Sequence, residues 1–313
     1  MIKVAVNGFG RIGRSLSKLI LADKHFKLVL INDIYDEKTM KYLFKHDSVY
    51  KESRYDLESI NITNHKNIED LKLNDVDIVF ECSGIYNSKK DLSSHIKNGA
   101  KKVILSAHSK DVKNLILGVN EDDYGFENIV AASSCTANCI APILKSIEKF
   151  VIVKNLNATT IHSYTSDQNL LDNKSKDIRR CRASAINIIP LTSNVKNTVS
   201  YFFPHLQGKI DSKSIRVPIE NGVLIDLHIQ LSKKIDYKDV KNLILEQSSK
   251  DIEISKDFIV SRDIRNNPHA TVVDMELLDL IDEDLLRVVL WQDNEYAYAK
   301  KVLELAKLIG KDL

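Results

Sequence analysis

The stretch IKVAVNGFGRIG, residues 2–13, decides the fold of the first half of this chain. The apolar run Ile2–Asn7 is typical of a buried strand, and it leads directly into Gly8, Gly10 and Gly13 at the start of a helical pattern. Glycines at this spacing let the backbone turn tightly and approach a pyrophosphate at a helix N-terminus. We therefore predict a strand, turn and helix that bind a dinucleotide.

Asp33 strengthens this prediction because it follows the next apolar run, Lys27–Asn32, about 20 residues after Gly13. A carboxylate there can bind the 2′-hydroxyl of a ribose and would repel a 2′-phosphate. The sequence therefore favours NAD over NADP. The alternative is a glycine turn without a ligand, and the acidic residue at the expected spacing argues against it.

The first half alternates apolar runs with amphipathic stretches. The expected strands are Ile2–Asn7, Lys27–Asn32, Asp77–Cys82, Lys102–Ser106 and Asn128–Ala132. The expected helices are Arg14–Ala22, Lys38–Lys45 and Lys89–Asn98. This alternation predicts an α/β domain of the Rossmann type, a doubly wound parallel sheet with helices on both faces. The polar region Ser48–Asn74 reads as edge strands and loops.

The pattern changes after Cys139. A helix over 141–150 is followed by longer β-type runs, and in Val223–Leu231 every second residue is apolar, which is typical of an antiparallel strand with one wetter face. Further strands are expected at Val272–Met275 and Leu286–Asp293. We predict an α+β domain with a largely antiparallel sheet over 135–298. A first domain over 1–134 would be completed by a C-terminal helix within 299–313.

Cys135 lies at the head of an apolar helical stretch, SSCTANCIAP at 133–142. A cysteine at a helix start faces unpaired N–H groups and the positive end of the helix dipole, and both favour a thiolate. His162 can stabilise that thiolate and move protons. The alternative is a structural cysteine and an unrelated histidine, against which the small, hydroxyl-rich flanks argue. With a nicotinamide cofactor, such a nucleophile indicates aldehyde oxidation through a thiohemiacetal and a thioester.

Composition excludes several classes of protein. The 313 residues carry 45 basic and 43 acidic side chains, dispersed along the chain, with 7% aromatic residues, which argues against a nucleic-acid surface. No apolar run is long enough to span a bilayer, and a strand at the N-terminus leaves no room for a signal peptide. Four cysteines make neither a disulfide framework nor a paired metal site, so we expect no metal and a cytoplasmic location.

The chain resembles the phosphorylating glyceraldehyde-3-phosphate dehydrogenase family over nearly its whole length. The motifs that carry the resemblance occur in order: NGFGRIGR at 7–14, IND at 31–33, SCTANC at 134–139, HSYTSDQ at 162–168, DIRR at 177–180, NIIP at 187–190, IRVP at 215–218 and WQDNEY at 291–296. The resemblance implies an NAD-dependent homotetramer that converts D-glyceraldehyde 3-phosphate and inorganic phosphate reversibly to 1,3-bisphosphoglycerate.

The resemblance also implies roles for individual residues. Cys135 matches the nucleophile and His162 the base. Asn294 matches the side chain that fixes the nicotinamide carboxamide, with Tyr298 nearby. The full set of implied cofactor residues is Gly8, Gly10, Arg11, Ile12, Gly13, Asp33, Ser83, Gly84, Ser106, Asn294 and Tyr298. The implied site for the substrate's phosphate is Thr165, Asp167 and Arg216, and that for inorganic phosphate is Ser134, Thr136 and Ser193.

The resemblance is incomplete at three places. Ala137 stands where the family usually has a threonine, and we expect this difference between small residues to be mild. Asn194 stands where the family has a glycine close to inorganic phosphate, and Asn173-Lys174 replaces a pair common in NAD-preferring members, which leaves mixed NAD and NADP use open. Asn194 and the segment Phe202-Phe203-Pro204 resemble erythrose-4-phosphate dehydrogenase, which releases an acid by hydrolysis. A non-catalytic NAD-binding protein is the remaining alternative. The joint presence of Cys135, His162, Arg216 and Asn294 argues against it.

Overall fold

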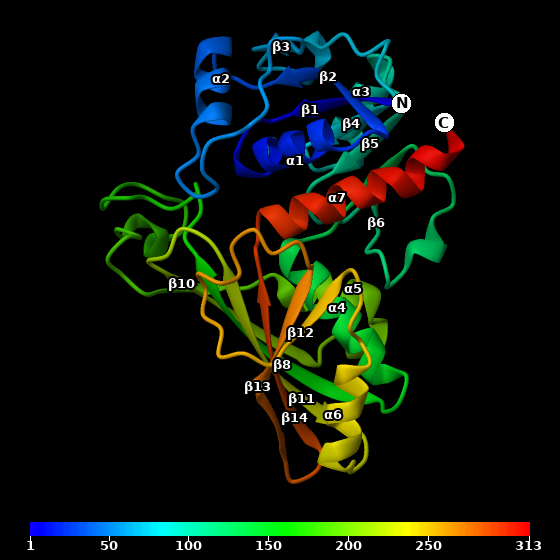
Figure 1. The fold of residues 1–313 in the computed structure, drawn as a ribbon, viewed down its shortest axis with the longest axis vertical. Coiled ribbons are helices and arrows are strands. Elements are labelled where there is room, and N and C mark those ends of the chain that lie inside the picture. The colour runs from blue at the N-terminus through cyan, green and yellow to red at the C-terminus, as the bar shows by residue number, and fades with distance from the viewer. The chain divides into compact units, whose positions relative to one another are not determined.

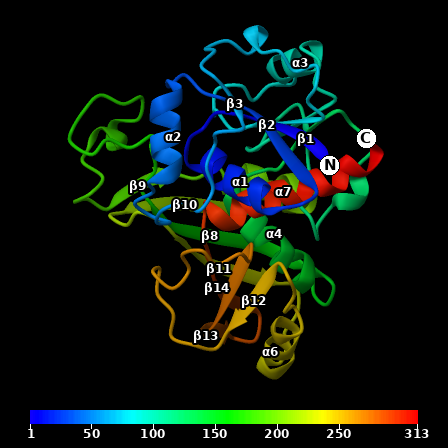
Figure 2. The ribbon, with the colours of Figure 1, turned by 45° about the horizontal axis from the view of Figure 1, so that its top comes forward.

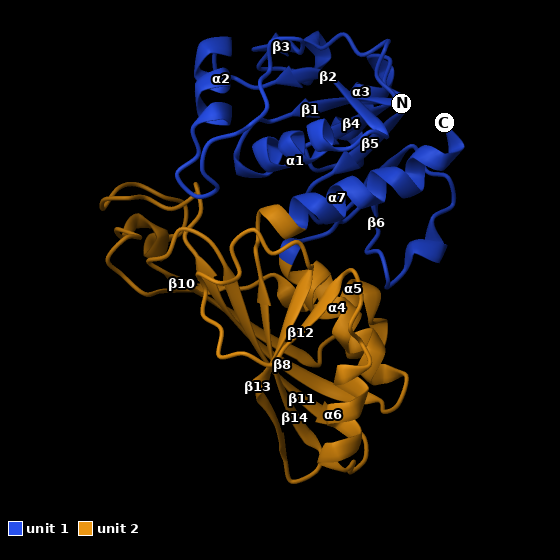
Figure 3. Cartoon of the chain, viewed as in Figure 1, with its two compact units in different colours: residues 1–135, 298–313 blue, residues 136–297 orange.

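The computed structural model describes residues 1–313, and the chain divides into two compact units (Figures 1 and 3). The first unit comprises residues 1–135 and 298–313, and the second comprises residues 136–297. Strands of the first unit are β1 Ile2–Asn7, β2 Phe26–Asn32, β3 Asn61–Thr63, β4 Ile78–Glu81, β5 Lys102–Leu105, β6 Lys113–Asn114 and β7 Ile129–Ala131. Its helices are α1 Arg11–Ala22, α2 Glu37–Lys45, α3 Lys89–Lys97 and most of α7 Tyr296–Ile309.

The first sheet has seven strands in the order β3-β2-β1-β4-β5-β7-β6, and every neighbouring pair is parallel. The chain leaves β1 towards β2 on one side and returns to β4 on the other, so the strand order reverses between β1 and β4. Ligands of open α/β sheets bind at such a reversal, outside the carboxyl ends of the strands. The predicted doubly wound sheet is confirmed.

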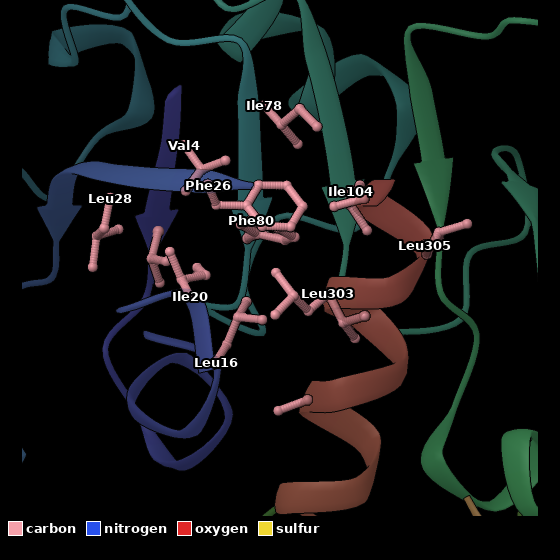
Figure 4. Close-up of a cluster of buried hydrophobic side chains, with 14 of the residues drawn as sticks. Val4, Leu16, Ile20, Phe26, Leu28, Ile78, Phe80, Ile104, Leu303 and Leu305 are labelled. Carbon is pink, nitrogen blue, oxygen red and sulfur yellow. The ribbon is translucent and has the colours of Figure 1, made fainter. Parts of the chain in front are cut away.

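Alternate residues of the first sheet enter two different cores. Val4 and Val6 pack in one core with residues of α1 and α7, whereas Ala5 joins a second core that includes Leu92 of α3. Figure 4 shows the first of these cores, where Leu303 of α7 points towards the sheet. The helices α1 and α7 lie side by side in two views of the molecule (Figures 1 and 2). The C-terminal helix therefore completes the core of the first unit.

The second unit contains a seven-stranded sheet in the order β12-β13-β14-β11-β8-β10-β9. Its strands are β8 Val153–Ser163, β9 Ile189–Thr192, β10 Ile210–Val217, β11 Val223–Leu231, β12 Ile252–Ser255, β13 Thr271–Ile281 and β14 Leu285–Gln292. Its helices are α5 Val195–Phe202, α6 Tyr237–Leu245 and α4 Cys135–Glu148, whose first residue belongs to the first unit. Four strand pairs are antiparallel and two are parallel, which confirms the predicted largely antiparallel sheet.

The alternation predicted for β11 is confirmed, since its five apolar odd-numbered residues are buried and the polar residues between them are partly exposed. Other elements were not predicted from the sequence: β8, β10, α5 and α6 carry polar residues that hide their periodicity. Helix α1 also begins at Arg11 rather than at the expected Arg14. None of the helices is both long enough and apolar enough to cross a membrane.

Candidate active site

The glycine turn between β1 and α1 has two glycines that the packing of the protein requires. At Gly8, with φ of +93°, an added Cβ would lie 2.3 Å from the backbone nitrogen of Ser83. At Gly13 an added Cβ would lie 2.0 Å from the carbonyl oxygen of Gly8. Side chains at these two positions would therefore collide with backbone atoms of the first unit.

Gly10 differs from its two neighbours in the motif. It is exposed, has an ordinary φ of −72°, and an added Cβ would meet nothing within 4 Å. The protein's own packing therefore gives no reason for a glycine there. The open space lies at the start of α1, where Arg11 and Ile12 follow and where backbone N–H groups favour a phosphate. These residues fit a dinucleotide pyrophosphate.

Asp33 follows β2 beside this turn, and backbone N–H groups fix its carboxylate. Phe9 N–H donates to Oδ2 at 2.5 Å, and Ile34 N–H donates to Oδ1 at 2.7 Å. The carboxylate is thus held next to the glycine turn, as the binding of a ribose hydroxyl requires. Two exposed apolar residues flank the same region, Ile34 after Asp33 and Ile85 after Gly84, at 62% and 66% exposure.

Ser83 and Ser106 lie at the carboxyl ends of neighbouring strands, β4 and β5, and both contact Glu81. Ser83 N–H donates to Glu81 Oε1 at 2.8 Å. Ser106 N–H and Oγ donate to the Glu81 carbonyl oxygen at 2.9 and 3.0 Å. Gly84, with φ of +73°, allows the tight turn after Ser83. The two predicted cofactor loops are therefore anchored on one buried residue.

Cys135 is the first residue of α4, and a turn with a strained backbone precedes it. Ser133 is fully buried and has φ of +57°, a left-handed conformation that is uncommon for a residue with a side chain. Its carbonyl oxygen accepts a hydrogen bond from Tyr298 Oη at 2.7 Å. Tyr298 is buried in the core of the first unit, and this burial raises the pKa of its hydroxyl well above the ordinary value. Its place among the cofactor residues stays a prediction. Its hydroxyl holds the turn that precedes Cys135.

His162 is buried near the carboxyl end of β8 in the second unit. Its Nδ1 lies 2.7 Å from the carbonyl oxygen of Ser163, which can only accept, so we assign the proton to Nδ1. Arg216 Nη1 also lies against Nδ1, but it donates to the same carbonyl oxygen at 2.8 Å and needs no second acceptor. In this tautomer Nε2 is the nitrogen left to accept a proton.

The environment of His162 opposes its protonation. Burial, followed by the positive charge of Arg216, lowers the pKa of His162 to about 3. Arg216 comes from β10, whose residue 216 pairs with residue 162 of β8 in a parallel ladder. The ladder therefore places a guanidinium beside the imidazole. An anion bound at Arg216 would offset the positive charge and raise the pKa of His162 again.

Thr165 and Asp167 follow β8 and belong to the same charged cluster. The Thr165 hydroxyl donates to one oxygen of Asp167, and Arg180 forms an ion pair with the other. Arg180 and Asp167 both contribute to the electrostatics of His162, with opposite signs. Two arginines of this segment form ion pairs: Arg180 with Asp167 and Arg182 with Asp172.

Asn294 is buried in the short connection between β14 and α7. Its Oδ1 accepts from Gly222 N–H at 2.9 Å and from Ser163 Oγ at 3.4 Å, so Nδ2 is the end left to donate. The preceding residue, Asp293, is fully buried and accepts two backbone N–H groups at the start of α7. These contacts fix the orientation of the Asn294 amide.

The residues predicted to hold inorganic phosphate are divided between the units: Ser134 belongs to the first, and Thr136 and Ser193 to the second. Ser193 Oγ accepts from Val195 N–H at 3.2 Å. Asn194 has φ of −91° and ψ of 3°, so this position does not need the left-handed backbone that favours glycine. At this position the difference from the family's glycine is therefore the bulk of the Asn194 side chain.

The other predicted residues also fall into two sets. Cys135 and all predicted cofactor residues except Asn294 belong to the first unit, whereas His162, Thr165, Asp167, Arg216 and Asn294 belong to the second. The pairing of Cys135 with His162 therefore stays a prediction. Cys139, one helical turn after the nucleophile, is fully buried, with Sγ 3.9 Å from the Trp291 carbonyl oxygen, as a packing residue would be.

Comparison with known proteins adds independent information. The profile described as glyceraldehyde 3-phosphate dehydrogenase, NAD binding domain, matches residues 2–89, and that described as glyceraldehyde 3-phosphate dehydrogenase, C-terminal domain, matches residues 134–294. Glyceraldehyde-3-phosphate dehydrogenase of Mycobacterium avium is 36% identical over 339 residues, covering 100% of this chain and 99% of the relative. Glyceraldehyde-3-phosphate dehydrogenase 2 of Bacillus subtilis is 35% identical over 334 residues, covering 99% of this chain and 97% of the relative.

Proposed function

Because the chain belongs to the glyceraldehyde-3-phosphate dehydrogenase family, we propose that it oxidises D-glyceraldehyde 3-phosphate with NAD and inorganic phosphate, reversibly, to 1,3-bisphosphoglycerate. Family membership and the class of enzyme, an NAD-dependent dehydrogenase, agree with the prediction from the sequence. The particular substrate and the chemistry of the cysteine are the proposal.

The observation that carries the proposal is the cluster around His162. Its Nδ1 is occupied by the Ser163 carbonyl oxygen, its Nε2 is left to accept a proton, and Arg216 lies against the ring. Arg216, together with the hydroxyl of Thr165 three residues after His162, provides the donors that a phosphate group requires. A base next to an anion site fits an aldehyde that carries its own phosphate.

We assign the chemical steps to residues of this chain. Cys135 Sγ attacks the aldehyde carbon, and His162 Nε2 takes the hydroxyl proton as the carbon is oxidised. Bound NAD would supply the hydride acceptor for the oxidation of this carbon. Cys135 then carries the acyl group as a thioester until inorganic phosphate displaces the sulfur and an acyl phosphate is released. The backbone N–H of Cys135 at the helix start stabilises negative charge on the substrate oxygen.

NAD is the proposed cofactor because the fixed carboxylate of Asp33 would bind the ribose hydroxyls and would repel a 2′-phosphate. The homotetramer and the cytoplasmic location belong to the same proposal and are carried over from the family resemblance and from the reactive thiol. Neither is needed for the chemistry assigned here.

The test is NADH formation from glyceraldehyde 3-phosphate and NAD, with and without inorganic phosphate, with erythrose 4-phosphate measured in parallel. We expect turnover of the three-carbon substrate that depends strongly on phosphate. Turnover without phosphate that favours the four-carbon sugar would instead identify a hydrolytic erythrose-4-phosphate dehydrogenase. NAD binding without turnover of either substrate would indicate a binding protein.

Cys135→Ala provides the matched control for the chemistry. Because the side chain of Cys135 supplies only the nucleophile in this scheme and its backbone N–H is kept in the variant, we expect the variant to lose turnover completely while its dissociation constant for NAD stays within about twofold of the parent. Isothermal titration calorimetry measures the binding. Loss of both turnover and NAD binding would mean that Cys135 has a structural role.

A further inference from the structure

A fully buried carboxylate lies directly below the proposed cofactor loops of the first unit. We propose that Glu81 is a positioning residue for the cofactor: it anchors a chain of buried polar groups that sets the geometry of the loops after β1, β2 and β4. This inference rests on the proposed use of NAD. It concerns a residue that neither contacts the cofactor in the scheme above nor belongs to any motif used to predict the site.

Glu81 collects three hydrogen-bond donors from three different parts of the first unit. Oε2 accepts from Asn7 Nδ2 at 2.6 Å and from His95 Nε2 at 2.8 Å, and Oε1 accepts from Ser83 N–H at 2.8 Å. The side chains of Glu81 and His95 are both 0% exposed. A buried carboxylate destabilises the folded protein unless it is fully hydrogen-bonded. Glu81 therefore depends on these three donors.

Asn7 extends the chain across the sheet. Its Oδ1 accepts from Asn32 Nδ2 at 2.8 Å, and Asn32 Oδ1 accepts from His65 N–H and from Thr63 Oγ1, both at 2.9 Å. Asn7 and Asn32 are the last residues of β1 and β2, as Glu81 is of β4. These hydrogen bonds therefore connect the carboxyl ends of strands β3, β2, β1 and β4, which are neighbours in the sheet.

The proposed cofactor loops next to these hydrogen-bonded groups are closely packed against one another. Gly8 N–H donates to the carbonyl oxygen of Asn32 at 2.8 Å, and the backbone nitrogen of Ser83 approaches Gly8 so closely that a Cβ there would lie 2.3 Å away. Ser83 is held at this distance by its bond to Glu81. A shift of Ser83 would therefore move the loop against the glycine turn on which the pyrophosphate is proposed to bind.

The charge of Glu81 also fixes the direction of every hydrogen bond in the chain. Because a carboxylate only accepts, Asn7 must present its NH2 group to Glu81 and its oxygen to Asn32, which in turn presents its oxygen to His65 N–H. An amide at position 81 would place its own NH2 group against a donor. If Asn7 and Asn32 turned over in response, the Asn32 NH2 group would face His65 N–H, which cannot accept.

His95 has no other role visible in the structure. Its Nδ1 is buried without a hydrogen-bond partner, so its only polar contact is the one that Nε2 makes with Glu81. The ring is supplied by α3, which packs on the opposite face of the sheet from α1. His95 thus ties the helix that follows the Ser83 loop to the same carboxylate.

The test compares Glu81→Gln with Asp312→Asn. Asp312 accepts a hydrogen bond from buried Lys102 at 2.6 Å in the same unit and lies in none of the proposed cofactor loops. Its variant therefore disturbs a charged pair without changing the hydrogen-bonded groups around Glu81. For each full-length protein, calorimetry measures the dissociation constant for NAD, and thermal unfolding measures stability. We expect Glu81→Gln to weaken NAD binding about tenfold or more, with KM for NAD raised more than kcat is lowered, because a buried group loses its partner.

Asp312→Asn should lower the melting temperature less than Glu81→Gln does, because the Asp312 carboxylate is partly exposed, and should leave the dissociation constant for NAD within about twofold. Equal weakening of NAD binding by the two variants, or none by Glu81→Gln, would overturn the inference. If Glu81→Gln does not fold, His95→Leu removes one donor and should still weaken NAD binding about threefold; unchanged binding would overturn the inference too. A parent protein that binds no NAD would overturn the proposed function itself.

Discussion

The carboxyl edge of the first sheet and the His162 cluster of the second unit use different means to prepare for a ligand. At the sheet edge, recognition rests on backbone shape: glycines that admit no Cβ, N–H groups at a helix start, and a carboxylate buried below the loops. In the second unit it rests on charged side chains around His162, whose pKa is lowered first by burial and then by the positive charge of Arg216. The first region is therefore sensitive to volume, and the second is sensitive to charge.

The largest effect is expected in the charge-sensitive region. His162→Asn removes the nitrogen that accepts the substrate proton, and we expect turnover to fall by roughly 10²–10⁴, the range for a positioned acid or base. Pre-steady-state NADH formation measures the loss. The dissociation constant for NAD should stay close to that of the parent because the predicted pyrophosphate and ribose contacts belong to the other unit. A rate close to that of the parent would remove His162 from the mechanism.

The next prediction tests sensitivity to volume with a matched pair in one motif. Gly13→Ala places a Cβ 2.0 Å from a backbone oxygen, so we expect it to destabilise the first unit by about 1–3 kcal/mol. Gly10→Ala meets nothing within 4 Å, so its melting temperature should be nearly that of the parent while NAD binds about tenfold more weakly.

Thermal unfolding and calorimetry on the same samples separate the two outcomes. A Gly10→Ala variant with unchanged affinity for NAD would show that no ligand occupies the open space above Gly10. Backbone shape at the glycine turn would then not determine ligand binding by the first unit.

The smallest expected effect concerns acid stability. The pKa of His162 is lowered from 6.5 to about 3 in the folded protein, so the unfolded state binds a proton first as the pH falls. His162 therefore contributes stability that is fully present above pH 6.5 and is lost as the pH falls towards 3.

Arg216→Ala removes the second cause of this shift and leaves the first, burial. We expect the pKa of His162 to rise but to stay below its ordinary value, and the variant to lose less stability between pH 6 and about 4. NMR titration of the imidazole measures the pKa, and His162→Gln serves as the control without a titrating group. A pKa that does not move in Arg216→Ala would assign the whole shift to burial.

Sequence alone predicted the features that depend on short spacings. The glycine turn, Asp33, the alternation in β11 and the helix at Cys135 each lie within one continuous stretch, where local conformation and periodicity decide the outcome. The parallel sheet of the first unit could be predicted for the same reason, because its buried strands are nearly continuous apolar runs separated by amphipathic helices.

The features that were missed depend on contacts between distant residues. Strand β10 reads IDSKSIRV and has no clear pattern, because its place in the sheet comes from pairing with β8 and β9 rather than from an apolar face. The bond from Tyr298 to Ser133 joins residues 165 positions apart. Glu81 and His95 belong to no recognisable motif. The only available signal is a polar residue at the end of an apolar strand, as in Asn7, Asn32 and Glu81.

The placement of α7 in the core of the first unit has a consequence for synthesis. A ribosome makes residues 1–135 first, but the core that contains Val4 and Phe80 stays open on one side until residues 298–313 emerge. The whole second unit, 136–297, is made in the interval and contains its own complete sheet. The unit begun first is therefore the last to close, and its apolar surface has to be shielded from aggregation while the rest of the chain is translated.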